Sequence, residues 1–518
     1  MILLISPPVS RPSEPPAGIA ALLGALRKEG VACRGIDLSL EGLLYLLSLG
    51  WSSPDVHDRW TGRAFRHRRE HLASLRKEAT YRHPDRYRRA VADLERVLGA
   101  VSSHRAARVG LADYGEEGRS PLRSSDLLGA AEEPEGNVFF PFFTARLSRV
   151  LMEENPDTVG ISINYLGQAL TAFAVIGWLR REVPRLRIVL GGGLITSWLH
   201  RPAAGNPFGG LADLVCPGPG EGTLLHLAGR EGGGWTARPC FDDFPLGDYL
   251  SPGVILPVAA SRGCYWRRCR FCPEAAEGNP HLSRRPAQVL GDLAALGARH
   301  APALFHFVDS AMSPALLSAL AGSDNPYPWS GFARVGAELA DPDFCRLLGA
   351  AGCVMLEVGV ESGSQRVLDA LDKGIDLATA SRALKALKGA GIGTYVYLLF
   401  GTPPEGREDA EKTLSFVAEN ALYIDYINVA LFNLPRGTAD EGLETRPFSD
   451  DDLSLYEDFV HPRGWGRREV RLFLDRVFRR HGAVAPILKR RPPVFTSSHA
   501  PFFLSGKAPG PPLAETQG

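Results

Sequence analysis

The residues with the most evident chemistry are three cysteines that stand close together in the stretch ASRGCYWRRCRFCPE, namely Cys264, Cys269 and Cys272. The chain holds only 8 cysteines in 518 residues, so this clustering is unusual. Thiolates are soft metal ligands, and nearby positive charge favours the thiolate over the thiol. Such charge is supplied by Arg262, Arg267, Arg268 and Arg270. The stretch therefore predicts a metal or metal-cluster site.

Three interpretations of this stretch remain open on the residues alone. A structural zinc ion needs a closed set of four ligands, and His281 is the only nearby candidate for the fourth. An iron–sulfur cluster with three thiolate-bound irons and one open corner needs no fourth cysteine. Three buried, unreactive thiols are the remaining alternative, which the spacing C-x4-C-x2-C and the flanking arginines disfavour.

Strands and helices alternate on both sides of the cysteines. Six apolar segments lie between residues 254 and 440: ILPVAAS, ALFHFVD, WSGFARV, VMLEVGVES, GTYVYLLFG and DYINVALFNL. Between them we expect helices at about 287–299, 314–321, 341–351, 377–390 and 408–420. Such alternation is typical of a parallel sheet and predicts a partial (β/α)6 barrel. The cysteines follow the first of these strands, at the carboxyl end, where parallel barrels carry their active sites.

The amino-terminal part also predicts a parallel α/β fold. MILLIS, a helix over 19–29 and VACRGIDL form a strand, helix, strand series, which resumes at PDTVGISIN and LRIVLGGG. We expect a Rossmann-like domain over 1–229 with a helical insertion at about 40–150, followed by a Gly/Pro-rich linker over 230–253. After the barrel we expect a helical extension over 441–504 and a disordered tail over 505–518.

Composition excludes several classes of protein. Lys plus Arg and Asp plus Glu both number 58, giving a net charge of +0, which disfavours binding to nucleic acid by bulk electrostatics. The insertion has twelve Lys and Arg against seven Asp and Glu over residues 51–100, a pattern that fits a solvated helical face better than an RNA-binding surface. The uncharged run over 159–179 has polar residues at its centre, and we expect a buried strand and helix there, not a membrane span. Sparse cysteines and the absence of a signal-peptide pattern predict a cytoplasmic protein.

The cysteine stretch resembles the signature of the radical S-adenosylmethionine (radical SAM) superfamily. That family usually has C-x3-C-x2-C with an aromatic residue before the last cysteine, the place that Phe271 holds here. The first gap, YWRR, is one residue longer than usual. The phrases FARVGAELADPDFCRLLGAAGCVMLEVGVESGSQRVLDALDKG and LLFGTPPEGREDAEKTLSF resemble the barrel of the methylthiotransferase-like branch, so the similarity covers about 257–435.

The resemblance implies a [4Fe-4S] cluster whose open iron binds SAM. It implies that Phe271 lies against the adenine, Glu361 binds the ribose hydroxyls, Arg334 lies near the methionine carboxylate and Asp309 faces the SAM pocket. Each has a structural alternative: Glu361 could open a helix, Arg334 could form a surface ion pair and Asp309 could cap a helix.

A Rossmann-like domain before such a barrel resembles the cobalamin-binding class of these enzymes. Ligands of parallel sheets bind outside the carboxyl ends of the strands. The residues that this resemblance places there are Pro7, Pro8, Asn164, Gly191, Gly192, Gly193, Gly220, Glu221 and Gly222. The D-x-H-x-x-G motif of many cobalamin proteins is absent, so a domain that only packs on the barrel remains an alternative.

The sequence thus predicts a radical SAM enzyme with a [4Fe-4S] cluster, SAM and cobalamin as cofactors. Its expected reaction is cobalamin-dependent methyl transfer or related radical chemistry on a small-molecule or peptide substrate that the sequence does not identify. We expect a flavodoxin- or ferredoxin-type electron donor, no membrane association and no nucleic acid partner. The alternatives are a tRNA methylthiotransferase-like radical SAM enzyme, and a zinc-stabilised RNA-binding protein.

Overall fold

The computed structural model describes residues 1–50, 58–200, 206–232, 234–438, 442–493 and 499–504. These residues divide into two compact units. The first holds Met1–Val254 with Ser449–Leu455 and Pro493, and the second holds Ile255–Phe448, Tyr456–Pro492 and the segment 499–504. Each unit is described by itself below.

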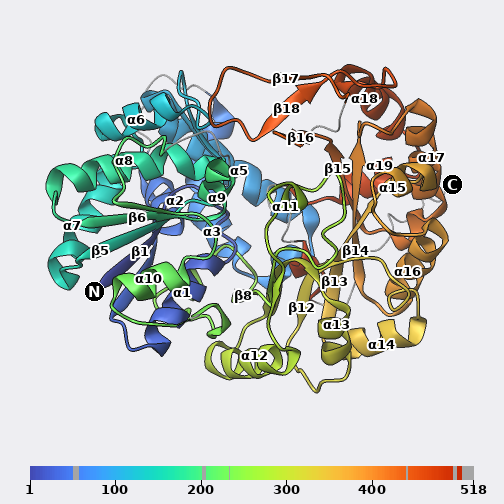
Figure 1. Cartoon of the computed structure of the whole chain (residues 1–518), viewed down its shortest axis with the longest axis horizontal. Helices are drawn as coiled ribbons and strands as arrows, with labels where there is room; N and C mark the ends of the chain where they lie inside the picture. The colour runs from blue at the N-terminus through green and yellow to red at the C-terminus, as the bar shows by residue number, and fades with distance from the viewer. Residues whose placement is uncertain (51–57, 201–205, 233, 439–441, 494–498, 505–518) are drawn as a thin grey trace. The chain divides into compact units, whose positions relative to one another are not determined.

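The first unit is built on a five-stranded parallel sheet of order β2-β1-β5-β6-β7. The strands are β1 (Ile2–Ser6), β2 (Cys33–Asp37), β5 (Thr158–Ser162), β6 (Arg187–Gly191) and β7 (Leu214–Cys216). Every residue of β1 and β5 is buried, as expected for central strands covered on both faces. Figure 1 shows α7 (Phe140–Glu154) and α8 (Leu166–Glu182) on one side of this sheet, and α1 (Ala17–Lys28) and α10 (Glu221–Leu227) on the other. The predicted α/β fold is confirmed.

The apolar run over 159–179 forms β5 and most of α8, as the sequence indicates. Its helical part is buried from Gly167 to Leu179 because the helix is covered within the unit. No helix in the described part of the chain has the length and apolar character needed to cross a membrane.

The insertion is helical, with one short hairpin. Its helices are α2 (Leu38–Ser48), α3 (Arg59–Leu75), α4 (Glu78–Tyr81), α5 (Pro84–Ser102), α6 (Ser124–Glu132) and α7, and its hairpin pairs β3 (Ala107–Val109) with β4 (Tyr114–Glu116). Along α5, Tyr87, Val91, Leu94 and Leu98 recur three or four residues apart and are all buried. This spacing places them on one face of the helix, which packs against the rest of the insertion.

The segment over 230–253 belongs to the first unit and packs against its sheet and helices. Asp243 accepts hydrogen bonds from Arg27 (Nη2 to Oδ1, 2.7 Å) and from the backbone N–H of Gly35 (2.7 Å). Tyr249 donates its hydroxyl to Asp37 at 2.8 Å. The segment that we expected to act as a linker is therefore tied to β2 and α1 by charged and polar contacts.

The second unit is built on a six-stranded parallel sheet of order β15-β14-β13-β12-β11-β8. The strands are β8 (Ile255–Val258), β11 (Leu304–Met312), β12 (Trp329–Ala333), β13 (Cys353–Glu361), β14 (Gly393–Phe400) and β15 (Tyr426–Leu431). Each pairs with its neighbour in the chain, which confirms the predicted series of six β/α units.

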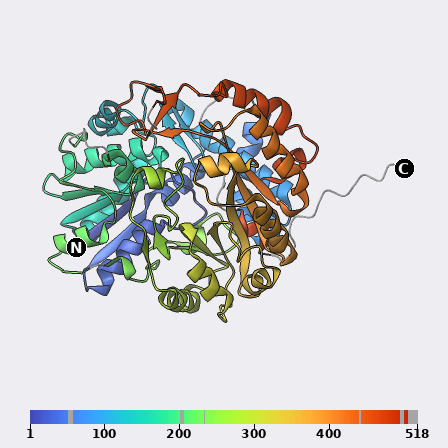
Figure 2. The same ribbon diagram turned by 45° about the vertical axis from the view of Figure 1, so that its right-hand side comes forward.

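Helices follow the strands of the second unit and cover the outer side of the curved sheet (Figures 1 and 2). They are α12 (Pro286–His300), α13 (Pro314–Ala321), α14 (Pro342–Ala350), α15 (Gln365–Ala370), α16 (Leu377–Gly389) and α17 (Arg407–Glu419). The sequence analysis places five of these helices within a residue or so at each end and misses the short α15.

The carboxyl-terminal extension begins with strands and continues with helices. A small antiparallel sheet pairs β16 (Leu434–Pro435), β17 (Thr445–Pro447) and β18 (Tyr456–Phe459) before α18 (Arg467–Phe473) and α19 (Ala485–Arg490). Its last turn, Ala500–Phe503, is buried, and the ring of Phe503 lies 5.7 Å from that of Tyr426. The tail expected to be disordered, 505–518, lies outside the described residues.

Candidate functional site

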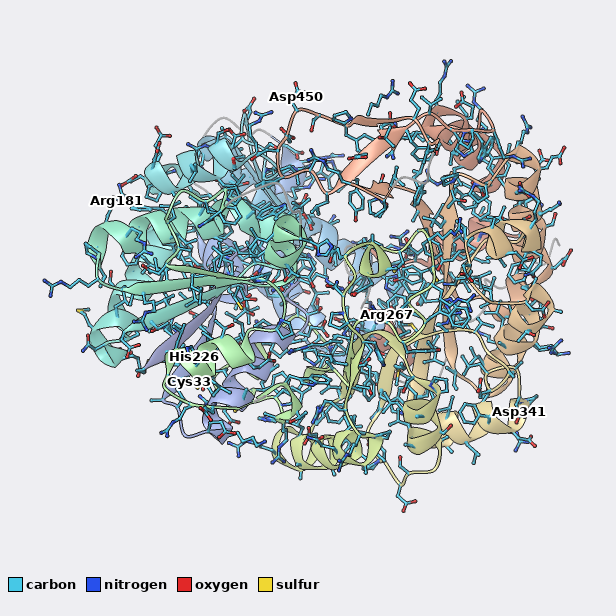
Figure 3. The ribbon with its side chains drawn as sticks, viewed as in Figure 1. Cys33, Arg181, His226, Arg267, Asp341 and Asp450 are labelled. Carbon is cyan, nitrogen blue, oxygen red and sulfur yellow. The ribbon has the colours of Figure 1, made fainter. Side chains whose placement is uncertain are left out.

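The cysteine loop starts at the carboxyl end of β8. After β8 the chain forms β9 (Ser261–Arg262), which pairs with β10 (Leu282–Ser283), and the three cysteines lie between these two short strands. Cys269 is buried, and Cys264 and Cys272 are partly buried. Figure 3 labels Arg267, which lies in this loop and is exposed. The fold thus puts the three thiols at the edge of the barrel where the sequence predicts them.

Burial and nearby cations act in opposite directions on these thiols. Burial raises the pKa of the Cys269 thiol, and the positive charges of Lys373 and Arg334 lower it. Burial also raises the pKa of Cys272, against backbone N–H groups of α11 (Pro273–Ala276) that favour the thiolate. Thiolates would be stabilised further by a bound cationic iron, so the surroundings suit metal-bound sulfur.

A single ion and a cluster make different demands on the three thiols of the loop. Within the residues that the structure describes, no three side chains of His, Cys, Asp or Glu are close enough to share one metal ion. A zinc ion requires its ligands within about 2.3 Å of one point. A cluster places its irons at separate corners, so three thiolates that each bind a different iron stand further apart. The three thiols, with Lys373 and Arg334 beside Cys269, are the donors available to either group.

His281, the candidate fourth zinc ligand, lies against Tyr265, with ring centroids 6.4 Å apart. Its Nδ1 is buried and has no hydrogen-bond partner among the described residues. His281 thus stays beside the cysteine loop, with a ring nitrogen that no hydrogen bond of the described residues uses.

Arg334 follows β12 and connects the cysteine loop to a turn on the other side of the site. Its Nη1 donates to Cys269 Sγ at 3.8 Å and its Nη2 donates to the carbonyl oxygen of Lys373 at 2.6 Å. Its guanidinium also lies 4.2 Å from the centroid of the Trp266 ring. These contacts differ from the surface ion pair that was the alternative role for Arg334.

Glu361 ends β13 in an unusual backbone conformation. The register of β13 against β14 shifts between Gly359 and Glu361, and Glu361 has a φ of 66°. Bulges of this kind redirect a side chain at the rim of a barrel, and a left-handed residue other than glycine often marks a functional site. The carboxylate forms an ion pair with Lys373, with 2.8 Å between Nζ and Oε1.

Phe271 and Lys373 lie next to each other. The ammonium of Lys373 is 5.4 Å from the centroid of the Phe271 ring, within the range of a cation–π interaction. Lys373 also pairs with Glu361 through its ammonium and accepts from Arg334 through its carbonyl oxygen, so residues from four separate segments converge near Cys269. Lys373 was not predicted from the sequence, since its place in the turn LDKG reveals nothing of the contacts it makes.

Asp309 has a structural partner. It lies in an irregular part of β11 and accepts hydrogen bonds from the backbone N–H of Ala260 at 3.0 Å and from the hydroxyl of Ser261. Burial raises the pKa of its carboxyl group, and these donors lower it. Asp309 thus holds the start of the cysteine loop, and no hydrogen bond among the described residues joins it to Glu361. Its place in a SAM pocket stays a prediction.

In the first unit, Asn164 and Gly192 shape the carboxyl edge of the sheet. Asn164 follows β5 and accepts a hydrogen bond from the backbone N–H of Gly193 at 2.9 Å, which ties the ends of β5 and β6 together. Gly192 has a φ of 111°, and a Cβ atom there would lie 2.3 Å from the carbonyl oxygen of Ile163. Only glycine allows this close approach of the two loops.

The other predicted residues of this edge differ in exposure. Gly193 and Gly222 are exposed and Gly191 and Gly220 are partly so, whereas Pro8 and Glu221 are buried. Beside Asn164, the side chains of Tyr165 and Leu166 are 49% and 38% exposed. The edge therefore exposes backbone and the side chains of Tyr165 and Leu166 to solvent, while Pro8 and Glu221 are buried beneath it.

A small pocket lies at the carboxyl ends of β14 and β15 in the second unit. It is lined by Phe400, Leu431, Phe432, Phe459, His461 and Arg467 among others. Arg467 donates to the side-chain oxygen of Asn433 at 2.7 Å and to the carbonyl of Phe432 at 3.3 Å. Burial lowers the pKa of Arg467. The pocket combines aromatic walls with a cation at the end of the barrel that carries the cysteine loop.

Comparison with known proteins identifies the barrel. Residues 258–417 match the radical SAM superfamily. This part of the chain is a radical SAM domain. The match includes the three cysteines, Arg334 and Glu361, so the predicted resemblance is confirmed.

Two curated relatives share part of the chain. An uncharacterized methyltransferase of Pyrococcus horikoshii is 27% identical over 39% of this chain and 44% of its own length. The anaerobic magnesium-protoporphyrin IX monomethyl ester cyclase of Rubrivivax gelatinosus is 26% identical over 32% of this chain and 30% of its own. The chain thus spans less than half of the length of either relative.

A solved structure resembles most of the chain. It is the radical S-adenosylmethionine methyltransferase TsrM from Kitasatospora setae, solved with cobalamin and a [4Fe-4S] cluster bound. The TM-score is 0.50, with 17% identity over 87% of this chain and 81% of that chain. At this identity the likeness concerns the fold, and it confirms the predicted combination of a Rossmann-like part and a radical SAM barrel.

Proposed function

We propose that the chain is a radical SAM enzyme that binds a [4Fe-4S] cluster through Cys264, Cys269 and Cys272. The observation that carries the proposal is the convergence beside these cysteines of Arg334 from the end of β12 and Glu361 from the end of β13. Carboxyl ends of barrel strands are where catalytic groups gather. The match of residues 258–417 to the radical SAM superfamily supports the same reading.

The proposed cluster would supply, when bound, the electron that splits the sulfonium of SAM into methionine and a 5′-deoxyadenosyl radical. The chain's own residues would then orient SAM. Glu361 would accept hydrogen bonds from the ribose hydroxyls, Phe271 would lie against the adenine, and Arg334 would attract the methionine carboxylate. Lys373, which contacts both Glu361 and the Phe271 ring, would keep these groups in place.

We propose that the first unit binds cobalamin at the carboxyl edge of its sheet and that the reaction is methyl transfer to a carbon atom. The glycines at the ends of β6 and before α10 would let backbone approach the flat ligand. The similarity to a methyltransferase supports this reaction, and the similarity to a cyclase supports related radical chemistry as the second form of the proposal.

The proposed activity requires partners. A one-electron reductant such as a flavodoxin or ferredoxin would supply electrons to the cluster. A small molecule or peptide would be the substrate. We propose that the enzyme acts in the cytoplasm, a reducing compartment in which its few cysteines would remain thiols.

SAM cleavage tests the proposal. The anaerobically reconstituted chain is incubated with SAM and dithionite, and 5′-deoxyadenosine and S-adenosylhomocysteine are quantified by mass spectrometry. We expect 5′-deoxyadenosine from the wild type and from Cys240→Ala, and none from Cys272→Ala. Retention of cobalamin during purification supports methyl transfer. A chain that binds one zinc ion and no iron or sulfide contradicts the proposal and favours a zinc-stabilised binding protein.

A further inference from the structure

Trp266 lies in the longer gap between Cys264 and Cys269 and docks on a turn that is distant in the sequence. Its indole N–H donates to the carbonyl oxygen of Asp372 at 2.9 Å. A Cβ atom added at Gly374, whose φ is 65°, would lie 2.1 Å from Cζ2 of the Trp266 ring. The ring therefore fills the space that the glycine leaves open.

Two arginines contact the same ring. The guanidinium carbons of Arg334 and Arg268 lie 4.2 Å and 5.0 Å from its centroid. Arg268 also pairs with the Asp372 carboxylate at 3.0 Å. Cation–π contacts with tryptophan are the strongest of their kind, so the arginines and the indole stabilise one another.

Every residue of the turn Leu371–Gly374 takes part in this docking. The carbonyl of Leu371 accepts from the backbone N–H of Arg270 at 3.1 Å, and the carbonyl of Lys373 accepts from Arg334 at 2.6 Å. The turn thus holds the cysteine loop by backbone and side-chain contacts on both sides of Trp266. We call Trp266, Arg334, Asp372 and Gly374 the tryptophan seat.

The longer gap is accommodated next to this seat. Arg267, which follows Trp266, has a φ of 52°, a left-handed conformation that lets one extra residue bulge out while the chain continues to Cys269. Arg267 itself is exposed. The longer gap thus leaves Arg267 in solvent and places the ring of Trp266 against the turn.

We infer that Trp266 is a positioning residue for the cluster: the tryptophan seat fixes the loop between Cys264 and Cys269 against the turn that carries Lys373. The inference rests on the proposed function, since it concerns how firmly the same three cysteines hold their cluster. Arg334 belongs to the seat and also contacts Cys269 Sγ at 3.8 Å, so the seat acts on the sulfur that is buried deepest.

The test measures cluster retention apart from catalysis. The full chain and its variants are reconstituted anaerobically, and the release of iron to a chelator is followed by absorbance. Outer-shell residues of metal sites affect affinity by about 10- to 100-fold. We expect Trp266→Leu to release iron about tenfold faster than the wild type. Trp266→Phe, which keeps the ring and loses the N–H, falls between the two.

Gly374→Ala attacks the seat from the other side, because its Cβ atom would displace the indole. We expect it to reproduce the Trp266→Leu release rate, and the double variant to be no faster than either single one. Trp60→Leu is the matched control, since Trp60 also lies under an arginine, Arg59, at 5.1 Å but belongs to the first unit. We expect its release rate to equal that of the wild type.

The outcomes separate this inference from the proposed function. If the wild type binds a cluster and Trp266→Leu and Gly374→Ala both release iron at the wild-type rate, Trp266 is only a surface anchor and the inference is wrong. If Trp266→Leu or Gly374→Ala fails to fold, the milder variants Trp266→Phe and Arg268→Gln replace it. Iron release faster than in the wild type then supports the inference, and release at the wild-type rate contradicts it. A wild type that takes up no iron contradicts the proposed function itself.

Discussion

Lys373 Nζ lies 2.8 Å from Glu361 Oε1, and the side chains of both are largely buried, with 8% and 13% exposed. Glu361 ends a barrel strand, and Lys373 lies in the turn that docks on the cysteine loop. The ion pair therefore joins the strand that is expected to bind SAM to the loop that is expected to bind the cluster. The predictions below start from this pair.

Removal of the lysine should destabilise the second unit. Lys373→Met leaves the Glu361 carboxylate buried without its cation, which costs about 3 kcal/mol in the free energy of unfolding. The double variant Glu361→Leu with Lys373→Met should recover most of that loss, because neither charge then remains. Urea denaturation followed by fluorescence measures both values.

The matched control is Arg407→Gln, which breaks the exposed pair of Arg407 and Glu411. Exposed pairs contribute less than about 1 kcal/mol, so we expect little change. Equal losses for Lys373→Met and Arg407→Gln would contradict the structural role of the buried pair.

Replacement of Glu361 should weaken SAM binding without loss of the cluster. Glu361→Gln removes a charged acceptor of the ribose hydroxyls, and hydrogen bonds to charged groups contribute about 1.5–3 kcal/mol, so the Kd for SAM should rise at least about tenfold. Equilibrium dialysis measures the Kd and iron analysis measures the cluster. Unchanged SAM affinity in a variant with full iron content would remove Glu361 from the SAM site.

Glu405 should make the stability of the second unit depend on pH. Burial raises its pKa from 4.5 to about 8, while the N–H groups of Gly401 and Trp465 lower it and the charge of Asp409 raises it. The folded state keeps the proton over this range and the unfolded state does not. The free energy of unfolding should therefore fall by up to about 1.4 kcal/mol per pH unit as pH rises from 4.5 to 8.

Glu405→Gln should flatten this dependence, because the amide does not titrate and still offers an oxygen to Trp465. Urea denaturation at several pH values compares the slopes of the two proteins, with Glu411→Gln, at an exposed position, as the control. The same slope in Glu405→Gln and wild type would mean that Glu405 is ionised in the folded protein.

Gly192 should tolerate no side chain. Its φ of 111° and ψ of 170° belong to a region that only glycine adopts readily, and a Cβ atom would meet the backbone of Ile163. Gly192→Ala should cost about 2 kcal/mol of stability in the first unit and abolish cobalamin retention. Gly129→Ala, in α6 of the first unit, where no atom lies within 4 Å of the added Cβ, should do neither. Wild-type behaviour of Gly192→Ala would contradict the close contact of the two loops.

Much of the fold follows from local sequence patterns. Buried parallel strands are nearly continuous apolar runs, so VMLEVGVES and GTYVYLLFG identify β13 and β14 without any knowledge of their neighbours. The carboxyl end of each strand then gives the place of Arg334 and Glu361. The spacing of the three cysteines likewise identifies the loop that holds them.

Contacts between distant segments could not be predicted in this way. Trp266 and Asp372 are 106 residues apart and meet only because α15 and its turn fold back over the cysteine loop. Ser449–Leu455 packs with the first unit, where Asp451 pairs with Arg123 at 2.8 Å, although its sequence resembles the polar helical extension around it. The strands β17 and β18 were missed because they are short and polar, with no alternation that marks a strand.

The measurement that tests the central claim most directly is the iron and acid-labile sulfide content of the anaerobically reconstituted chain and of its single cysteine variants. We predict about four irons and four sulfides per chain for the wild type and for Cys240→Ala, and a large loss of both for Cys264→Ala, Cys269→Ala and Cys272→Ala. Full iron and sulfide content in any of these three variants, or one zinc and no iron in the wild type, would contradict the account.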